Sequence, residues 1–210
     1  MEQTTAETVK EESKALFYLF GLPLATRSDN GSPFAASKGL LGLTSFSAWF
    51  MYLGIVPDRI SPGSPYQNGS HERMHGDIKR EIQGKTPGGT SANQAALDLW
   101  VEEYNTVRPH EALGMRAPSE IYTPSSRTYE GDDFEWAYPL GFETRRVSNR
   151  GCIKLSKKRH FLSTALRGLT VGVQQIEETE YTIWLGEFSI AVLETRLESV
   201  KPTDAIQLMK

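Results

Sequence analysis

The chain has 210 residues, 39% of them hydrophobic, which is enough to bury the core of one large domain or of two small domains. Its single cysteine, Cys152, excludes an internal disulfide and any metal site built on several cysteines. The net charge of −3 is low for a protein that binds nucleic acid, so such a function would need basic residues gathered locally. The longest apolar run, residues 46–57, is too short to span a membrane, and the start of the chain is charged. We therefore expect a protein of the bacterial cytoplasm with no membrane partner.

The first predicted elements are a helix and a short strand. Residues 5–20 have the apolar spacing of a helix. Residues 24–28 have the pattern of a strand, which Asn30-Gly31 ends because both residues tolerate a positive φ. Asp29 is therefore predicted to lie at the exit of a strand.

A second helix is predicted from Thr44 to a stop at Gly54. Its apolar residues recur at i, i+3, i+4 and i+7, which is typical of a helix face buried in a core, and we favour this interpretation over an aromatic platform for stacked bases. Residues 55–60 are predicted to form a short edge strand, because Pro57 is tolerated at an edge. The apolar residues of the helix are Phe46, Trp49, Phe50 and Leu53.

The next segment is predicted as a mobile Pro/Gly-rich loop, residues 61–70, and a helix, residues 70–83. Glu72 falls in the first turn of that helix and faces outward, with Lys79 about 10 Å further along the same face. One carboxylate at a strand exit, a second on a helix and a basic residue beyond suit a phosphodiester bridged by Mg²⁺, which one or two carboxylates typically bind. The alternative interpretation is a solvent-exposed helix face beside an Asp in a turn.

The run His71-Glu72-Arg73-Met74-His75 supports a competing hypothesis. It has the pattern H-E-x-x-H, in which two histidines one turn apart can bind Zn²⁺ while the Glu activates water. A zinc peptidase is disfavoured by the charge of Arg73, by the position of the run directly after a Pro/Gly loop, and by the lack of an evident third ligand.

A fourth helix is predicted after a cluster of helix-breaking residues at 85–90, with Ser91 as its cap. Arg108-Pro109-His110 ends this helix. We interpret His110 as a hydrogen-bonding residue at the helix end, and a metal ligand or catalytic base is the alternative. The apolar face of the helix consists of Leu97, Trp100, Val101 and Tyr104.

Beyond residue 138 the pattern changes from helical to alternating. The polar stretch of residues 124–138 is predicted as a linker, and the short strands that follow it are predicted to form a small β-barrel. The predicted strands are residues 142–147, 152–155, 169–176, 181–185 and 188–193, with turns at 149–151, 156–159 and 177–180.

Basic residues gather in the first part of this predicted barrel. Between Glu143 and Gly168 the chain has eight Lys and Arg residues and one acidic residue, so the rest of the chain is acidic. Phosphate contacts supply most non-specific affinity for DNA, and we therefore predict a DNA-binding surface centred on the hairpin of residues 156–160. The alternative is an ordinary solvated surface. The predicted DNA-binding residues here are Arg145, Arg146, Lys154, Lys157, Lys158 and Arg159.

Four separated motifs follow one another between residues 14 and 124. They are Ser28-Asp29-Asn30-Gly31-Ser32-Pro33-Phe34, then Gly54-Ile55-Val56-Pro57, then Gln67-Asn68-Gly69 with Glu72-Arg73, and finally Tyr104-Asn105-Thr106-Val107-Arg108-Pro109-His110-Glu111-Ala112-Leu113-Gly114 followed by Pro118-Ser119-Glu120. In this order they resemble the catalytic core of insertion-sequence transposases, which are DDE recombinases of the retroviral integrase superfamily.

The resemblance implies an α/β (α+β) architecture with a partial ribonuclease H-like core at residues 1–123, a linker at 124–138 and a small Src-homology-type β-barrel at 139–200. It also implies DNA transposition by metal-dependent strand cleavage and strand transfer, with Mg²⁺ or Mn²⁺ as the cofactor. Asp29 and Glu72 match the second and third catalytic, metal-binding acids of the family. Lys79 and Arg73 would contact DNA, and the pocket would be shaped by Asn30, Gln67 and Asn68.

The first acid of the family has no match here, because no Asp precedes Asp29 in this sequence. We therefore expect the chain to be the carboxy-terminal portion of a transposase that cleaves DNA poorly by itself. It would act on element ends and target DNA, near the nucleoid, as a homo-oligomer or with a polypeptide that carries the first Asp. The alternative function is that of a non-catalytic DNA-binding remnant or partner subunit.

Overall fold

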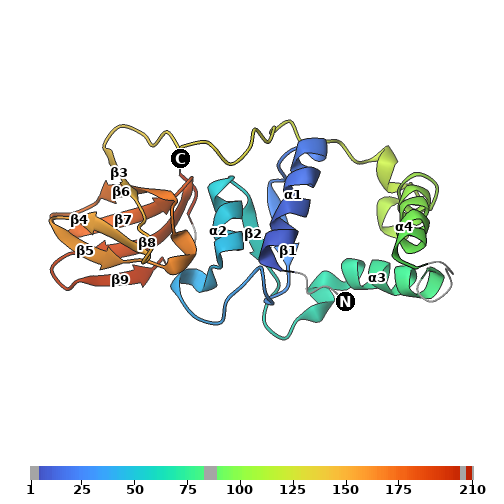
Figure 1. Ribbon diagram of the computed structural model, residues 1–210, viewed down its shortest axis with the longest axis horizontal. Coiled ribbons are helices and arrows are strands. Elements are labelled where there is room, and N and C mark those ends of the chain that lie inside the picture. The colour runs from blue at the N-terminus through green and yellow to red at the C-terminus, as the bar shows by residue number, and fades with distance from the viewer. Residues whose placement is uncertain (1–4, 83–88, 204–206, 210) are drawn as a thin grey trace. The chain divides into compact units, whose positions relative to one another are not determined.

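The computed structural model describes residues 5–82, 89–203 and 207–209 (Figure 1). The chain divides into two compact units. Unit 1 combines Met1–Pro62 with Ser126–Lys210, and unit 2 is Gly63–Ser125. The secondary structure is a mixture of α and β, as predicted. Among the described residues, no helix is both long and apolar enough to cross a membrane.

The first half of unit 1 contains two helices and two strands at the places that the sequence predicted. The first helix begins where the hydroxyl of Thr5 accepts the backbone N–H of Thr8 at 3.2 Å, and it ends at Gly21, whose φ is +75°. These elements are α1 (Ala6–Phe20), β1 (Ala25–Ser28), α2 (Ser45–Tyr52) and β2 (Val56–Arg59).

The strands β1 and β2 pair in parallel, from Ala25 opposite Val56 to Ser28 opposite Arg59. Parallel neighbours need a crossover connection, and α2 lies in the connection between them. The helix starts in a capping box, in which Thr44 and Ser47 each accept the other's backbone N–H. The crossover brings the exits of both strands to the same end of this small sheet.

An aromatic cluster holds α1 against α2. Phe17 of α1 lies 5.8 Å from the Trp49 ring and 5.7 Å from the Phe50 ring, measured between ring centroids. Trp49 and Phe50 are only 6% and 5% exposed. The aromatic stripe of α2 is therefore core, as predicted, and its faces are not available for stacking against bases.

The second half of unit 1 is dominated by a five-stranded antiparallel sheet in the order β3-β6-β7-β8-β9, together with a separate hairpin of β4 and β5. All five predicted strands are present. The strands are β3 (Phe142–Arg146), β4 (Cys152–Leu155), β5 (Lys158–Phe161), β6 (Thr170–Gln175), β7 (Glu180–Leu185), β8 (Phe188–Glu194) and β9 (Ser199–Pro202).

Two strands were not predicted, and one predicted turn is wrong in its extent. We expected residues 156–159 to form a turn, but only Ser156 and Lys157 do so, with φ values of +49° and +65°, and β5 begins at Lys158. Because the sequence of β5 is mostly hydrophilic, its pattern did not predict a strand. The strand forms by antiparallel pairing with β4. The segment β9 was missed because Pro202 and Lys201 lack a strand pattern.

The helix α2 packs on two cores at once. Its Phe46, Trp49 and Phe50 face the aromatic cluster with α1, whereas Met51 and Ala48 belong to the core of the C-terminal sheet. A helix that is apolar on all sides is expected to be buried on all sides. The C-terminal sheet and the first 62 residues consequently form one compact unit, whereas the predicted division at residues 123 and 138 stays a prediction.

The segment that we predicted as a linker is held to unit 1 by specific hydrogen bonds. The guanidinium of Arg127 donates to the carbonyl oxygens of Pro23 at 2.9 Å, of Leu53 at 2.8 Å and of Gly54 at 3.0 Å. Further along, the Trp136 indole donates to the carbonyl of Tyr52 at 2.6 Å. Residues 126–138, which we call the strap, thus lie across the first half of the unit before β3 begins.

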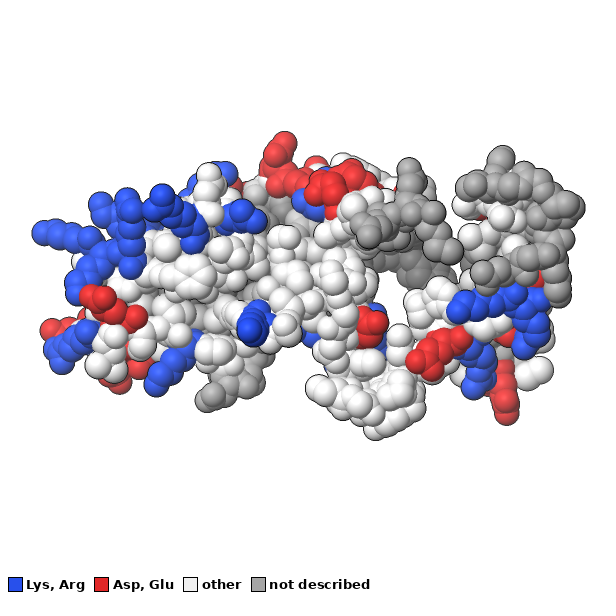
Figure 2. Space-filling view, turned by 60° about the horizontal axis from the view of Figure 1, so that its bottom comes forward, with Lys and Arg blue, Asp and Glu red and all other residues white. Residues whose placement is uncertain are grey.

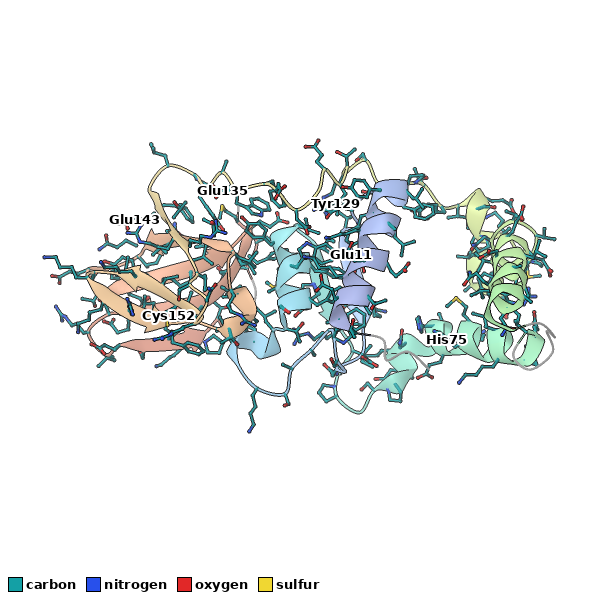
Figure 3. The ribbon with its side chains drawn as sticks, in the orientation of Figure 1. Glu11, His75, Tyr129, Glu135, Glu143 and Cys152 are labelled. Carbon is teal, nitrogen blue, oxygen red and sulfur yellow. The ribbon has the colours of Figure 1, made fainter. Side chains whose placement is uncertain are left out.

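Asp132 binds four side chains through its two carboxylate oxygens. Its Oδ1 accepts hydrogen bonds from the indole of Trp49 at 2.8 Å and from the hydroxyl of Tyr129 at 2.7 Å, while Oδ2 pairs with Lys10 at 3.2 Å and Lys14 at 3.0 Å. Figure 3 labels Tyr129 beside α1. Burial by itself would raise the pKa of this carboxyl, but the four donors outweigh burial and hold the pKa well below its usual range.

Unit 2 is helical. The predicted helix at 70–83 is present as α3, which starts one residue earlier, and residue 83 lies outside the described residues, as does most of the breaker cluster at 85–90. The next helix begins at Gly89, two residues before the predicted cap at Ser91. The long helices are α3 (Gly69–Glu81) and α4 (Gly89–Thr106), and the 3₁₀ turns are η2 (Pro65–Asn68), η3 (Glu111–Leu113) and η4 (Pro118–Glu120).

We predict that Asp132→Asn destabilises the protein by about 1–2 kcal/mol at pH 7, a figure reduced for solvent screening because the side chain is 32% exposed. The pKa of Asp132 is lower in the folded protein than in the unfolded chain. Its carboxylate therefore adds to the free energy of unfolding above the unfolded pKa of about 3.9, and this stabilisation is lost as the pH falls below that value. Urea unfolding at pH 7 and at pH 3 measures both effects.

The matched control is Asp133→Asn, which removes the neighbouring carboxylate of the strap, an exposed one. It should leave the free energy of unfolding nearly unchanged. Equal losses in the two variants would contradict the role assigned to Asp132.

Candidate carboxylate site and basic surface

Asp29 is exposed and directly follows β1, as predicted. Its Oδ1 accepts the backbone N–H of Gly31 at 2.9 Å, which fixes the carboxylate in a short turn. Asn30 donates from its amide to the carbonyl of Ile60 at 2.9 Å and so ties the exit of β1 to the exit of β2. The strand exit therefore presents a carboxylate whose second oxygen has no protein partner among the described contacts.

Glu72 lies in the first turn of α3, and it is exposed. Arg73 and Lys79 on the same helix are also exposed, and Gln67 and Asn68 lie in η2 immediately before it. These residues form one continuous element of unit 2, whereas Asp29 and Asn30 belong to unit 1. A cation shared by Asp29 and Glu72 stays a prediction.

The donor chemistry of the two acids fits a hard divalent cation. Exposed carboxylates with water and phosphate oxygens are the ligands that Mg²⁺ and Mn²⁺ prefer. Within the described part of the chain, no three His, Cys, Asp or Glu side chains gather as a metal site.

A partly exposed ion pair between Arg108 and Glu81 holds the C-terminal end of α3, and no pattern in the sequence predicted it. Both guanidinium nitrogens of Arg108 donate to Glu81, at 3.1 and 2.8 Å, and the Trp100 indole donates to Glu81 at 2.7 Å. Arg108 and Trp100 together lower the pKa of Glu81 to about 2. The motif that ends α4 thus binds back to the helix that carries Glu72.

His110 makes the kind of contact that we predicted for it. Its Nε2 lies 3.4 Å from the carbonyl oxygen of Tyr104, and its ring meets the Tyr104 ring edge-on at 4.5 Å. Its backbone pairs with Arg116 in an isolated bridge. These contacts indicate a structural hydrogen-bonding histidine.

The basic residues of unit 1 gather over β3, β4 and β5, where Figure 2 shows them in blue. Four of them line a hollow of about 600 Å³ together with Ser148 and Asn149. No acidic side chain lines this hollow among the described residues. The four basic residues are Arg146, Arg150, Lys154 and Arg159.

The predicted DNA-binding residues are not equivalent. Arg146, Lys154 and Arg159 line the hollow, whereas Arg145 pairs with Glu143 and Lys158 pairs with Glu198. An ion pair within the chain offsets part of the charge that a phosphate would meet. Arg150 was missing from the predicted DNA-binding residues. Its position in the same basic run between Glu143 and Gly168 could have predicted it.

One family matches part of this chain. The family described as Integrase core domain matches residues 53–118, a range that includes Glu72, Lys79 and Arg108 and excludes Asp29 and the C-terminal sheet.

Curated relatives come from bacterial insertion elements. The uncharacterized 39.2 kDa protein of insertion element IS476 from Xanthomonas euvesicatoria is 32% identical over 115 residues, 54% of this chain and 31% of that protein. The IS407 uncharacterized 31.7 kDa protein from Burkholderia multivorans is 32% identical over 102 residues, 48% of this chain and 34% of that protein. The transposase InsD of IS2 from Escherichia coli is 34% identical over 101 residues, 47% of this chain and 31% of that protein. The matches thus span about a third of the length of these relatives.

A solved structure is similar over a longer stretch. A chain of the simian T-cell lymphotropic virus intasome, determined by cryo-EM in complex with the PP2A regulatory subunit B56 gamma, aligns with all of this chain and with 66% of its own length. The TM-score is 0.44 and the sequence identity is 12%.

We predict that Arg108→Ala lowers the melting temperature measured by the far-UV signal of the helices. The variant takes the bidentate partner from Glu81 and leaves it only the Trp100 indole and Arg80, which is 3.9 Å away. The folded pKa of Glu81 is lowered, so the stabilisation is present above its unfolded pKa of about 4.3 and is lost as the pH falls toward 2. Thermal melts followed by far-UV circular dichroism at pH 7 and pH 3 measure this.

Arg80→Ala is the control, because Arg80 approaches Glu81 only to 3.9 Å, pairs more closely with Asp77 and has a side chain that is 70% exposed. An equal fall in melting temperature in the two variants would contradict the stabilising role assigned to the bidentate pair of Arg108 and Glu81.

Proposed function

We propose, from the premise that residues 53–118 belong to the integrase core of DDE-type insertion-sequence transposases, that this chain takes part in DNA transposition. The observation that carries the proposal is the integrase core match around Glu72, supported by a basic hollow in unit 1. The reaction would be cleavage of a DNA strand at an element end and its transfer to a target duplex.

In this function Asp29 and Glu72 would bind Mg²⁺ or Mn²⁺. The cation supplies Lewis-acid stabilisation of charge on the phosphodiester and activates the attacking hydroxyl or water. Asp29 is already oriented by Gly31, and Glu72 is presented by a helix whose far end is fixed by Arg108. Lys79 and Arg73 would bind phosphates of the DNA, and Asn30, Gln67 and Asn68 would shape the pocket.

The basic hollow supplies the second part of the proposal. Its four cations, with a serine and an asparagine between them, suit the phosphate oxygens of a duplex. We propose that the C-terminal strands act as a small Src-homology-type barrel that binds DNA through this hollow. Lys157 would add charge in the turn between β4 and β5, and Arg145 and Lys158 would contribute less because each already pairs with an acid.

Partner molecules follow from the same chemistry. Two matched acids are fewer than the three that the family uses, so a homo-oligomer or a polypeptide that supplies another carboxylate would complete the metal site. The second candidate function is a DNA-binding subunit without catalysis, which the basic hollow would support by itself. DNA as substrate would bring the protein to the bacterial nucleoid.

We predict that Glu72→Gln and Asp29→Asn each weaken Mn²⁺ binding at least about tenfold, because even changes outside the ligand shell cost 10–100-fold in metal affinity. Electron paramagnetic resonance of free Mn²⁺, titrated with the protein and a DNA duplex, measures the affinity. Glu102→Gln, which removes an exposed carboxylate of α4, is the control and should bind Mn²⁺ normally. If the protein binds DNA but all variants bind Mn²⁺ with equal affinity, the non-catalytic function is favoured.

We further predict that the triple variant Arg146→Ala, Lys154→Ala, Arg159→Ala binds any duplex more weakly. The slope of log affinity against log salt should flatten by about 2–3, since each lost phosphate contact is worth about 0.9. Fluorescence anisotropy at several salt concentrations measures the slope. Arg196→Ala removes an exposed arginine that pairs with Glu178 outside the hollow, and it should leave the slope unchanged. An unchanged slope in the triple variant would contradict the proposal that DNA binds in the hollow.

A further inference from the structure

Two histidines of α3 converge on one point of its exposed surface. His71 and His75 are one helical turn apart, their ring centroids are 4.3 Å apart, and their Nε2 atoms are 2.7 Å apart. Both side chains are exposed, and His75 is labelled on α3 in Figure 3. The two ring nitrogens that could bind a metal ion therefore already face each other.

We propose that His71 and His75 form a chelating site for a borderline transition-metal dication such as Zn²⁺ or Ni²⁺. Imidazole nitrogen suits Zn²⁺, Ni²⁺ and Cu²⁺, whereas carboxylate and water suit Mg²⁺ and Mn²⁺. The site is therefore different in chemistry from the one proposed for Asp29 and Glu72, and it stands whether or not that function holds.

The geometry needs only a small adjustment to admit the ion. Zinc lies about 2.0–2.1 Å from each imidazole nitrogen, so a tetrahedral ion would separate the two Nε2 atoms by about 3.4 Å. The rings would move apart by a few tenths of an ångström on each side. Exposed side chains can make that change by rotation about χ1 and χ2 without disturbing the helix backbone.

The expected affinity follows from the number of ligands. In the described part of the chain no third His, Cys, Asp or Glu joins the pair, so water completes the coordination shell. A site with two imidazoles has half the protein ligands of a structural zinc site, and we expect a dissociation constant on the order of 1–100 μM. A site of this strength binds its metal reversibly and does not hold the fold together.

Isothermal titration of the untagged 210-residue protein with Ni²⁺, and separately with Zn²⁺, tests the proposal. The expected result is one saturable ion per chain. His71→Gln and His75→Gln should each weaken binding at least about tenfold, because a single imidazole no longer chelates. Circular dichroism of the two variants verifies that α3 is retained, which is expected because both residues are exposed.

Two control variants separate this site from others. The chain has four histidines, and His110→Gln removes the one that contacts Tyr104, so Ni²⁺ binding should be unchanged. Glu72→Gln should also keep Ni²⁺ binding, even where it abolishes Mn²⁺ binding, so failure of the proposed function is distinguishable from failure of this inference. Absence of saturable binding at 1 mM Ni²⁺, about tenfold above the expected range, or binding that survives both single variants, would overturn the proposal.

Discussion

The carboxylate of Asp132 joins three segments of unit 1 that are far apart in sequence. It accepts hydrogen bonds from Trp49 of α2 and Tyr129 of the strap, and it pairs with Lys10 and Lys14 of α1. Each contact taken alone is worth little at a partly exposed site, but together they hold the strap against both helices. The strap continues into β3, and on the way Trp136 and Tyr138 bind further backbone carbonyls of unit 1.

The helix α2 makes the same connection through apolar contacts. Its aromatic residues pack on Phe17 of α1, and Met51, on another side, packs among the strands of the C-terminal sheet. The crossover that pairs β1 with β2 is therefore buried between two cores, and the strand exit that presents Asp29 rests on a well-packed base. A carboxylate on a rigid element can be presented to a cation with little loss of conformational entropy on binding.

Three kinds of exposed side chains in this protein differ in the ions that they suit. The acids Asp29 and Glu72, whose shared site is a proposal, have the chemistry for hard dications. The pair of His71 and His75 suits softer dications, and the hollow lined by Arg146 and Arg159 suits phosphate. The hollow lies entirely within unit 1 and the histidine pair within unit 2, so each can act without the other. The integrase core match contains Glu72 and ends before the hollow, so the two features for which DNA contacts are proposed lie in separate parts of the sequence.

Local patterns in the sequence determined the helices α1, α2 and α3, the strand before Asp29 and the first-turn position of Glu72, because caps, breakers and apolar periods involve residues only a few positions apart. They also identified the basic run and the motifs between Gly54 and Gly114 that lie within the Integrase core domain match. Tertiary structure alone decided that the polar strap is bonded across unit 1, that β5 and β9 are strands, that Arg108 reaches back to Glu81, and that Arg150 faces the hollow while Lys158 is paired. Asp132 and Trp49 are 83 residues apart, and the worth of such a contact depends on the packing of every element between them, which no local pattern encodes.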